Sequence, residues 1–318
     1  MSTDLTEKVK HAARQLLWAT SPALFDRVVD QHRGQVFSIG ILTGRSPLRL
    51  FDAPVPNPVL TSSDVADLPA AFVADPFLIR HGGGWHMFFE AMSRVDRRGC
   101  ICVASSRDGY RWAYDRVVLR EPFHLAYPHV FEFAGEHFMI PDSPGYGVRL
   151  YKGVAFPHQW RLVCQLIDHP YMFDNTPFAF DGYWWMYSAC SRSRHASKVL
   201  CLFVADSPFG PWREHPRSPV AGDDPRVCRP AGRVQLIDGR PIRFAQDGSP
   251  SYGTSVRAVE VLELTPETYE ERVIESPLLS AGKDAWNIGG MHHVDAWQLG
   301  QDVWLAAVDG WHWRHPAN

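Results

Sequence analysis

Short apolar runs of strand length, separated by turn residues, follow one another along most of the chain. Five of these runs share one layout: each opens at a polar or aromatic residue and ends on a glycine about nine residues later. Four copies carry a nearby proline, and these prolines are 52, 49 and 53 residues apart: Pro76, Pro128, Pro177 and Pro230. Self-similarity at this period is typical of radially repeated β-sheets. The pattern therefore predicts an all-β fold, a five-bladed β-propeller.

Each copy places one residue in the same register at the start of an innermost strand. These residues are Asp75, Tyr127, Asp174, Arg229 and His292. Because the innermost strands of a propeller surround its axis, we expect these five side chains to meet in one central pocket.

The first 34 residues follow a different pattern. Val9, Ala12, Ala13, Leu16 and Leu17 recur at helical spacing, so an amphipathic helix is expected there. We predict an N-terminal helical cap over residues 1–34 and a single propeller domain over residues 35–318. The apolar run 36–42 would be a strand that completes the last blade and closes the ring without an exposed edge.

The composition is that of one large folded body. The chain of 318 residues is 45% hydrophobic and contains 12 Trp, 18 Phe and 10 Tyr, enough for a large core. A net charge of −3 and a pI near 6.6 provide no general attraction to nucleic acid or to anionic membranes. We therefore expect no nucleic-acid partner.

Targeting and cofactor signals are missing from the sequence. The first twenty residues are charged, and no later run is long and apolar enough for a membrane span, so a cytoplasmic protein is expected. The six cysteines lack CxxC spacing and are expected to be buried hydrophobic residues. The glycines at 82–84 fit a hairpin turn and not a phosphate loop, so no cofactor is expected. The oligomeric state stays open.

Four segments carry a resemblance to a known family: Ser38-Ile39-Gly40, Asn57-Pro58-Val59-Leu60-Thr61, Phe72-Val73-Ala74-Asp75-Pro76-Phe77 and Arg229-Pro230-Ala231-Gly232-Arg233. They are similar to bacterial stand-alone relatives of the N-terminal domain of plant glucosamine inositolphosphorylceramide transferase, over roughly residues 36–311. That domain in turn resembles the five-bladed propellers of glycoside hydrolase family 43 and its fructosidase and mannoside-phosphorylase cousins, in which catalytic carboxylates open the innermost strands.

The family-43 resemblance implies roles for two carboxylates. An Asp-Pro on the first innermost strand supplies the general base there, and Asp75-Pro76 is similar to it. A second Asp orients the substrate and raises the pKa of the acid, and Asp174 stands in a similar strand with its proline displaced. The acid is normally a Glu before Ala-Pro in the next repeat, where this chain has Arg229. This departure leaves the acid, the bond type and the stereochemistry open.

Other carboxyl groups can be considered as the missing acid. Glycoside hydrolysis needs one protonated and one ionised carboxyl group, about 5 Å apart for retention or about 6.5–9.5 Å apart for inversion. The candidates besides Asp75 and Asp174 are Glu90, Glu132, Asp142 and Asp247. An apolar environment would raise the pKa of such an acid, whereas each residue can alternatively anchor a loop through hydrogen bonds.

Arg229 places a permanent cation with five hydrogen-bond donors in the acid's position. Such a group suits a carboxylate or phosphate on the ligand, and Arg233 lies four residues further on. These residues favour an anionic sugar or a sugar phosphate. Alternatively, Arg229 pairs with Asp174 or Asp247 and neutralises buried charge.

Aromatic and histidine residues complete the set of candidate ligand contacts. Tyr127 and His129 can offer a stacking surface and hydrogen bonds to a sugar. His292 and His293 are adjacent in a strand, so at most one is expected to face the axis. Without a third convergent ligand they do not form a metal site, and no metal is expected.

Three functions are compatible with an axial pocket of this kind. The leading hypothesis is a glycosidase-like, carbohydrate-active enzyme that cleaves or transfers a glycosyl group, with Asp75 as base or nucleophile and Asp174 as orienting carboxylate. The second is a non-catalytic module that binds a sugar phosphate or nucleotide sugar for a glycosyltransferase pathway. The third is a pocket reused for non-hydrolytic chemistry, such as cyclisation or elimination.

Overall fold

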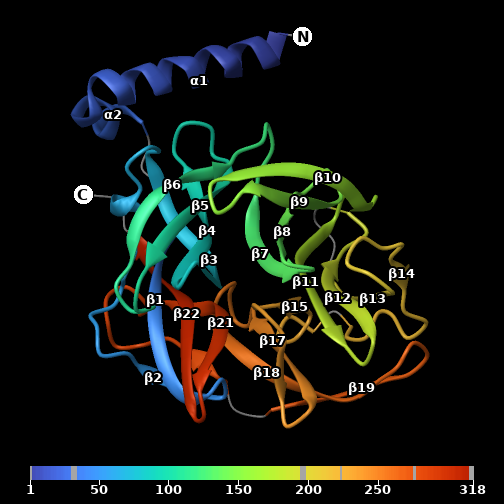
Figure 1. Cartoon of the computed structure of the whole chain (residues 1–318). Helices are drawn as coiled ribbons and strands as arrows, with labels where there is room; N and C mark the ends of the chain where they lie inside the picture. Colours follow the sequence, from blue (N-terminus) through green and yellow to red (C-terminus); the bar gives the residue numbers. More distant parts are fainter. Residues whose placement is uncertain (1, 30–33, 194–197, 223, 275–276, 315–318) are drawn as a thin grey trace.

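Five antiparallel sheets form a ring in the computed structural model, which describes residues 2–29, 34–193, 198–222, 224–274 and 277–314 (Figure 1). This arrangement confirms the five-bladed propeller that the repeat predicts. Four blades follow one another in chain order, and each begins with its innermost strand.

The bounds of the strands in these four blades are as follows. Blade one contains β3 (Ala70–His81), β4 (Gly84–Ser93), β5 (Gly99–Ser106) and β6 (Ala113–Leu119). Blade two contains β7 (Ala126–Phe133), β8 (Glu136–Asp142), β9 (Val148–Ala155) and β10 (Gln159–Ile167). Blade three contains β11 (Met172–Phe180), β12 (Tyr183–Cys190), β13 (Val199–Ala205) and β14 (Arg213–Glu214). Blade four contains β15 (Arg229–Pro230), β16 (Gln235–Ile237), β17 (Arg240–Asp247), β18 (Ser255–Leu264), β19 (Tyr269–Val273) and β20 (Leu279–Ser280).

Strands from the N-terminal and C-terminal parts of the chain together form the fifth blade. Its order is β21 (Gly290–Gly300), β22 (Val303–Arg314), β1 (Gly34–Ser46) and β2 (Arg49–Asp52). The register of β1 against β22 runs without a break from Gly34↔Arg314 to Gly44↔Trp304. This pairing covers the strand expected over residues 36–42 and closes the ring as predicted.

The innermost strands are irregular at the positions that face the axis. The β3, β7 and β11 registers shift at Asp75, Tyr127 and Asp174. These three residues have positive φ angles of 55°, 45° and 54°. Positive φ is uncommon for residues other than glycine. Blades one, two and three therefore hold their axial residues in bulges instead of in a regular pleat.

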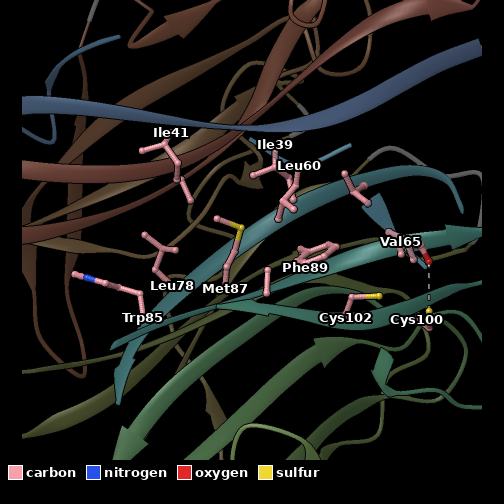
Figure 2. Close-up of a cluster of buried hydrophobic side chains, with 14 of the residues drawn as sticks. Ile39, Ile41, Leu60, Val65, Leu78, Trp85, Met87, Phe89, Cys100 and Cys102 are labelled. Carbon is pink, nitrogen blue, oxygen red and sulfur yellow. Dashed lines mark hydrogen bonds between the residues drawn. The ribbon is translucent and has the colours of Figure 1, made fainter. Parts of the chain in front are cut away.

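Apolar side chains fill the spaces between neighbouring blades. One cluster joins β1 of blade five to blade one, where Ile39, Ile41, Leu78, Met87 and Phe89 are all fully buried (Figure 2). Cys100 and Cys102 belong to the same cluster. In the described part of the chain all six cysteines are free, and five of them are buried, as hydrophobic core residues are.

Two helices precede the propeller and lie at one side of it, beyond blade one (Figure 1). They are α1 (Ser2–Thr20) and α2 (Pro22–Val28); the 3-10 turn η1 (Ser62–Asp64) precedes blade one. Phe25 and Val29 pack on Val95 in the turn between β4 and β5, and Arg94 of the same turn pairs with Asp26 at 2.6 Å. None of the helices among the described residues combines the length and apolarity that crossing a bilayer would require.

Candidate active site in the axial pocket

Four carboxyl groups line one cavity of about 270 Å³ at the start of the innermost strands. A guanidinium and two imidazoles also face it, and aromatic residues form much of the remaining wall. The charged and titratable residues in the lining include Asp75, Glu90, His124, Asp142, Asp174, Arg229 and His292, and the aromatic ones are Phe37, Phe72, Phe173 and Tyr252. The repeat thus brings Asp75, Asp174, Arg229 and His292 together from four blades.

Asp75 is held by backbone contacts on both sides of its bulge. Its own N–H donates to Asp309 Oδ2 at 3.0 Å, and its Oδ2 accepts a hydrogen bond from the N–H of Tyr127 at 3.2 Å. Burial raises the pKa of Asp75 to about 7, with the charge of His292 opposing the rise and that of Asp309 adding to it. Asp75 can therefore exchange a proton near neutral pH.

His292 connects Asp75 to Asp309. Its Nδ1 lies 2.7 Å from Asp309 Oδ1, and its Nε2 lies 3.9 Å from Asp75 Oδ1. Burial opposes protonation of the ring, but the contact with Asp309 outweighs it and raises the pKa of His292. The same contact keeps the pKa of Asp309 below its ordinary value despite burial. An ionised Asp309 thus orients His292 toward Asp75.

His293 approaches Asp75 as well. Its Nδ1 is 3.7 Å from Asp75 Oδ1, while its Nε2 lies 3.1 Å from the carbonyl of Pro76. The strict alternation expected for His292 and His293 does not hold, because the β21 register shifts between Met291 and His293. His293 does not line the cavity; burial lowers its pKa to about 4, so the ring is neutral.

Asp75, His292 and Asp309 are the residues best placed to hold a metal ion. One ligand atom from each lies within 4.8 Å of the others. Asp309 already accepts hydrogen bonds on both oxygens, from Asp75 and from His292. Asp75 Oδ1 and His292 Nε2 have no hydrogen-bond partner among the described residues, and both residues line the pocket.

Asp174 and Arg229 form an ion pair across the boundary of blades three and four. Arg229 Nε lies 2.6 Å from Asp174 Oδ2, and the guanidinium also stacks over Tyr252, 5.2 Å from the ring centroid. The sequence left two arrangements open for Arg229, contact with an anionic ligand or pairing with Asp174 or Asp247. The structure shows the pair with Asp174. Its other nitrogen atoms have no hydrogen-bond partner among the described residues, and Arg229 lines the pocket.

Asp142 is committed to holding the backbone of the next blade. Its Oδ2 accepts the N–H of Asp174 at 2.9 Å, and its Oδ1 accepts from the side-chain amide of Asn175 at 3.2 Å. Burial and the charge of Asp174 raise the pKa of Asp142 well above its usual range. Asp142 lines the pocket, but its contacts are those of a structural anchor.

Glu90 combines burial with an unused oxygen. It lies on β4 opposite Ala74, is 5% exposed, and its Oε1 has no hydrogen-bond partner among the described residues. The nearest cationic candidate, His124 Nε2, is 3.6 Å away, and burial lowers the pKa of that ring. Burial, followed by the charge of Asp75, raises the pKa of Glu90 well above its usual range. Burial thus favours the protonated form of Glu90.

Several sequence candidates lie outside the cavity lining. Tyr127 points along the axis, where its hydroxyl contacts Thr176 Oγ1 at 2.8 Å and accepts the N–H of Gly232 at 2.7 Å. Arg233 pairs with Asp295 at 2.8 Å and donates to the Val130 carbonyl.

Two more candidates outside the lining, His129 and Asp247, also contact interior residues. His129 is buried against Phe77, with ring centroids 4.8 Å apart. Asp247 is paired with Arg257 at 2.7 Å. Tyr127, His129, Arg233 and Asp247 are thus interior residues of the propeller, because their blades turn them away from the pocket mouth.

Two pocket residues, and one residue behind the pocket, had no signal in the repeat. Phe37 comes from β1 and stacks on His292 at 4.5 Å between ring centroids. Tyr252 comes from the loop between β17 and β18. Asp309 lies within β22 in register with His293, and it contacts His292 without lining the cavity.

The fold defines a class, the five-bladed propellers with a glycoside-hydrolase-like fold. The β-1,2-mannobiose phosphorylase of Listeria innocua superposes with a TM-score of 0.61 at 12% identity, over 80% of this chain and 94% of that one. A family 117 glycoside hydrolase of Zobellia galactanivorans gives a TM-score of 0.53 at 14% identity, over 88% and 91%. At these identities the similarity shows the fold alone.

Sequence comparison identifies the family. The family "Glucosamine inositolphosphorylceramide transferase 1, N-terminal" matches residues 30–311, and the chain belongs to it. Glucosamine inositolphosphorylceramide transferase 1 of Oryza sativa subsp. japonica is 35% identical over 297 residues, and that of Arabidopsis thaliana is 32% identical over 296. Each match covers 86% of this chain, but the chain spans only about 40% of either relative's length. The expected resemblance is thereby confirmed.

Proposed function

We propose that this chain is a carbohydrate-active enzyme that cleaves or transfers a glycosyl group in the axial pocket. One observation carries the proposal: Asp75 and Glu90 line the same small cavity, burial raises the pKa of both carboxyl groups, and the charge of Asp75 raises the pKa of Glu90 further. Glycosyl transfer requires two carboxyl groups in one site, one protonated and one ionised.

The two residues have different roles in this proposal. Glu90, which holds its proton and has an unused oxygen, donates that proton to the oxygen of the leaving group. Asp75, whose pKa is about 7, removes a proton from the incoming water or acceptor hydroxyl, or attacks the sugar directly. Glu90 thus takes over the task of the acid that is missing at position 229.

The remaining polar residues position the sugar and the base. Asp174 is fixed by Arg229 and orients sugar hydroxyl groups, while His292, held by Asp309, sets the charge around Asp75. Phe37, Phe72 and Phe173 offer apolar wall for a sugar ring.

The charges of the pocket bear on the substrate. Burial favours the neutral forms of Glu90 and Asp142, and the two cations at the pocket are engaged, Arg229 by Asp174 and His292 by Asp309. An anionic group would therefore find no unengaged partner among them, which favours a neutral or amine-bearing sugar over the anionic sugar that Arg229 suggested from the sequence. The names of the relatives contain glucosamine, an amine-bearing sugar, which supports the same choice.

A binding module for a glycosyltransferase pathway is the second candidate. It is favoured by one observation, the replacement of the usual acid by an ion-paired Arg229. A module of this kind would bind a sugar without needing a protonated Glu90.

The two candidates are separated by assaying turnover and binding together. Aryl glycosides of neutral and amino sugars are offered to the wild type, to Asp75→Asn and to Glu90→Gln, with exposed Asp52→Asn and Glu136→Gln as matched controls. Turnover that is lost only in the two pocket variants supports the enzyme. Saturable binding of the same sugars without turnover, unchanged in Glu90→Gln, would support the binding module instead.

A further inference from the structure

The N-terminal helix turns its apolar side away from the propeller. Val9 and Leu16 of α1 are 61% and 65% exposed, whereas His11, Arg14 and Trp18 are half-buried toward the domain. A helix that merely covers a domain places its apolar face inward. The exposed face of α1 is therefore available to a partner.

The second helix also exposes apolar side chains. Leu24 and Val28 of α2 are 46% and 61% exposed, while Phe25 between them is fully buried against Val95. We use the name apolar helix face for Val9, Leu16, Leu24 and Val28. None of these side chains is needed to hold the helices on blade one, because Phe25, Val29 and the Arg94–Asp26 pair do so.

A hollow of about 730 Å³ with a cationic lining lies between α1 and the β4–β5 turn. Its charged lining is Lys8, Arg14, Arg97 and Arg98 against Glu7 and Asp96. Asp96 is already engaged by Arg120 at 3.1 Å, and Glu7 by Lys10 at 2.9 Å. Arg97 and Arg98 are exposed and form no ion pair with any described residue. We call this cavity the basic hollow, because cations outnumber anions in its lining although the whole chain has a net charge of −3.

From these two features we propose that the N-terminal end of the molecule docks on an anionic membrane surface. An interfacial helix buries its apolar face about 5–10 Å into the boundary between headgroups and acyl chains. With the apolar helix face at that depth, the basic hollow on the other side of α1 lies among the headgroups. Clustered Lys and Arg are attracted there by anionic lipids.

Charge selects this partner over a second copy of the chain. Two copies paired through the apolar helix face would leave the cations of both basic hollows without a partner, because each hollow lies on the other side of its α1. An anionic surface complements both features at once: its acyl chains accept the aliphatic residues, and its headgroups accept the guanidinium groups of Arg97 and Arg98.

Vesicle flotation of the full chain tests the proposal. Vesicles of phosphatidylcholine with 30% phosphatidylserine should bind the protein, and vesicles of phosphatidylcholine alone should bind it much less; rising salt should weaken the binding. Arg97→Gln/Arg98→Gln should lower the partition coefficient by roughly five-fold for each cation removed, about 25-fold together. Val9→Ser/Leu16→Ser should lower it by at least about ten-fold.

Arg213→Gln/Arg217→Gln is the matched control, since it removes two exposed cations from blade three and should leave vesicle binding unchanged. Thermal unfolding confirms that each variant is folded. Equal partition of the wild type and both N-terminal variants, or no binding to either vesicle, overturns the proposal. A dimer in light scattering that disappears in Val9→Ser/Leu16→Ser, without vesicle binding, assigns the face to a second copy and equally overturns it.

Discussion

Arg229 Nε and Asp174 Oδ2 lie 2.6 Å apart in the wall of the pocket, and this contact joins blade four to blade three. A guanidinium does not release its proton under physiological conditions, so it cannot do the work of a general acid. The pair therefore separates this pocket from the glycosidase arrangement that it resembles. In the proposed mechanism Asp174 therefore keeps the orienting role, and Glu90 of blade one donates the proton.

Replacement of Arg229 by alanine should destabilise the fold. The variant leaves Asp174 buried and without its counter-charge, which costs about 3 kcal/mol, the lower part of the range for a broken buried pair because the Arg229 side chain is one-fifth exposed. Urea unfolding at neutral pH measures the loss. The double variant Arg229→Ala/Asp174→Asn should recover much of it. If the single variant is as stable as the wild type while sugar affinity falls, Arg229 serves the ligand instead.

Replacement of Asp75 by asparagine should lower the activity and, at pH 8, raise the stability of the fold. Turnover should fall by at least about 10²-fold, because the variant cannot take up a proton or attack a sugar. The folded-state pKa of Asp75, about 7, lies above its ordinary value of 3.8, so the folded protein binds the extra proton between these values. The contribution of this proton to the free energy of unfolding is complete below pH 3.8 and is lost as the pH rises to about 7.

The Asp75→Asn variant should lack this pH dependence. At pH 8 it should unfold at a higher urea concentration than the wild type, whose Asp75 is then ionised and buried. Urea unfolding at several pH values from 4 to 8 provides the measurement, with Asp52→Asn as control. A wild-type stability that rises over this range because of Asp75 would contradict the assignment.

Replacement of Glu90 by glutamine should remove the proton donor while keeping the shape of the pocket. We expect turnover to fall by about 10²- to 10⁴-fold for substrates with poor leaving groups, and much less for activated aryl glycosides that leave without protonation. The alkaline limb of the pH–rate profile should disappear with the acid. An equal loss for all leaving groups would indicate that Glu90 positions the substrate and does not donate a proton.

The sequence could predict the backbone of the site better than its side chains. The proline register placed Asp75, Asp174, Arg229 and His292 correctly at the strand starts, because a propeller repeats its backbone from blade to blade. The same register placed Tyr127 there, but its side chain turns along the axis to Thr176 and Gly232. Side-chain direction depends on the bulge in each innermost strand, and no local pattern specifies it.

The choice among the carboxyl groups needed the structure as well. Glu90, Asp142 and Asp247 all lie at or near the ends of second strands and look alike in sequence. Asp142 is occupied by the N–H of Asp174 and Asp247 by Arg257, and of these three only Glu90 keeps an unused oxygen. These differences arise from contacts with residues ten or more positions away, which a single sequence does not reveal. Residues such as Tyr252, which reach the pocket from a loop, have no periodic signal at all.

Two tyrosines of the axial region should respond in opposite ways to loss of the hydroxyl group. Tyr127→Phe leaves the buried N–H of Gly232 without its acceptor, so the free energy of unfolding should fall by about 1–3 kcal/mol while sugar affinity per folded molecule is unchanged. Tyr252 lines the pocket and stacks under Arg229, and no hydrogen bond of its hydroxyl is among those described. Tyr252→Phe should therefore leave stability nearly unchanged and weaken sugar binding by about three- to ten-fold, the loss of one ordinary hydrogen bond. Urea unfolding and calorimetric titration of each variant measure both quantities. If Tyr127→Phe weakens binding while Tyr252→Phe does not, the ligand reaches down the axis beyond Asp75, and the pocket at the strand starts is only its entrance.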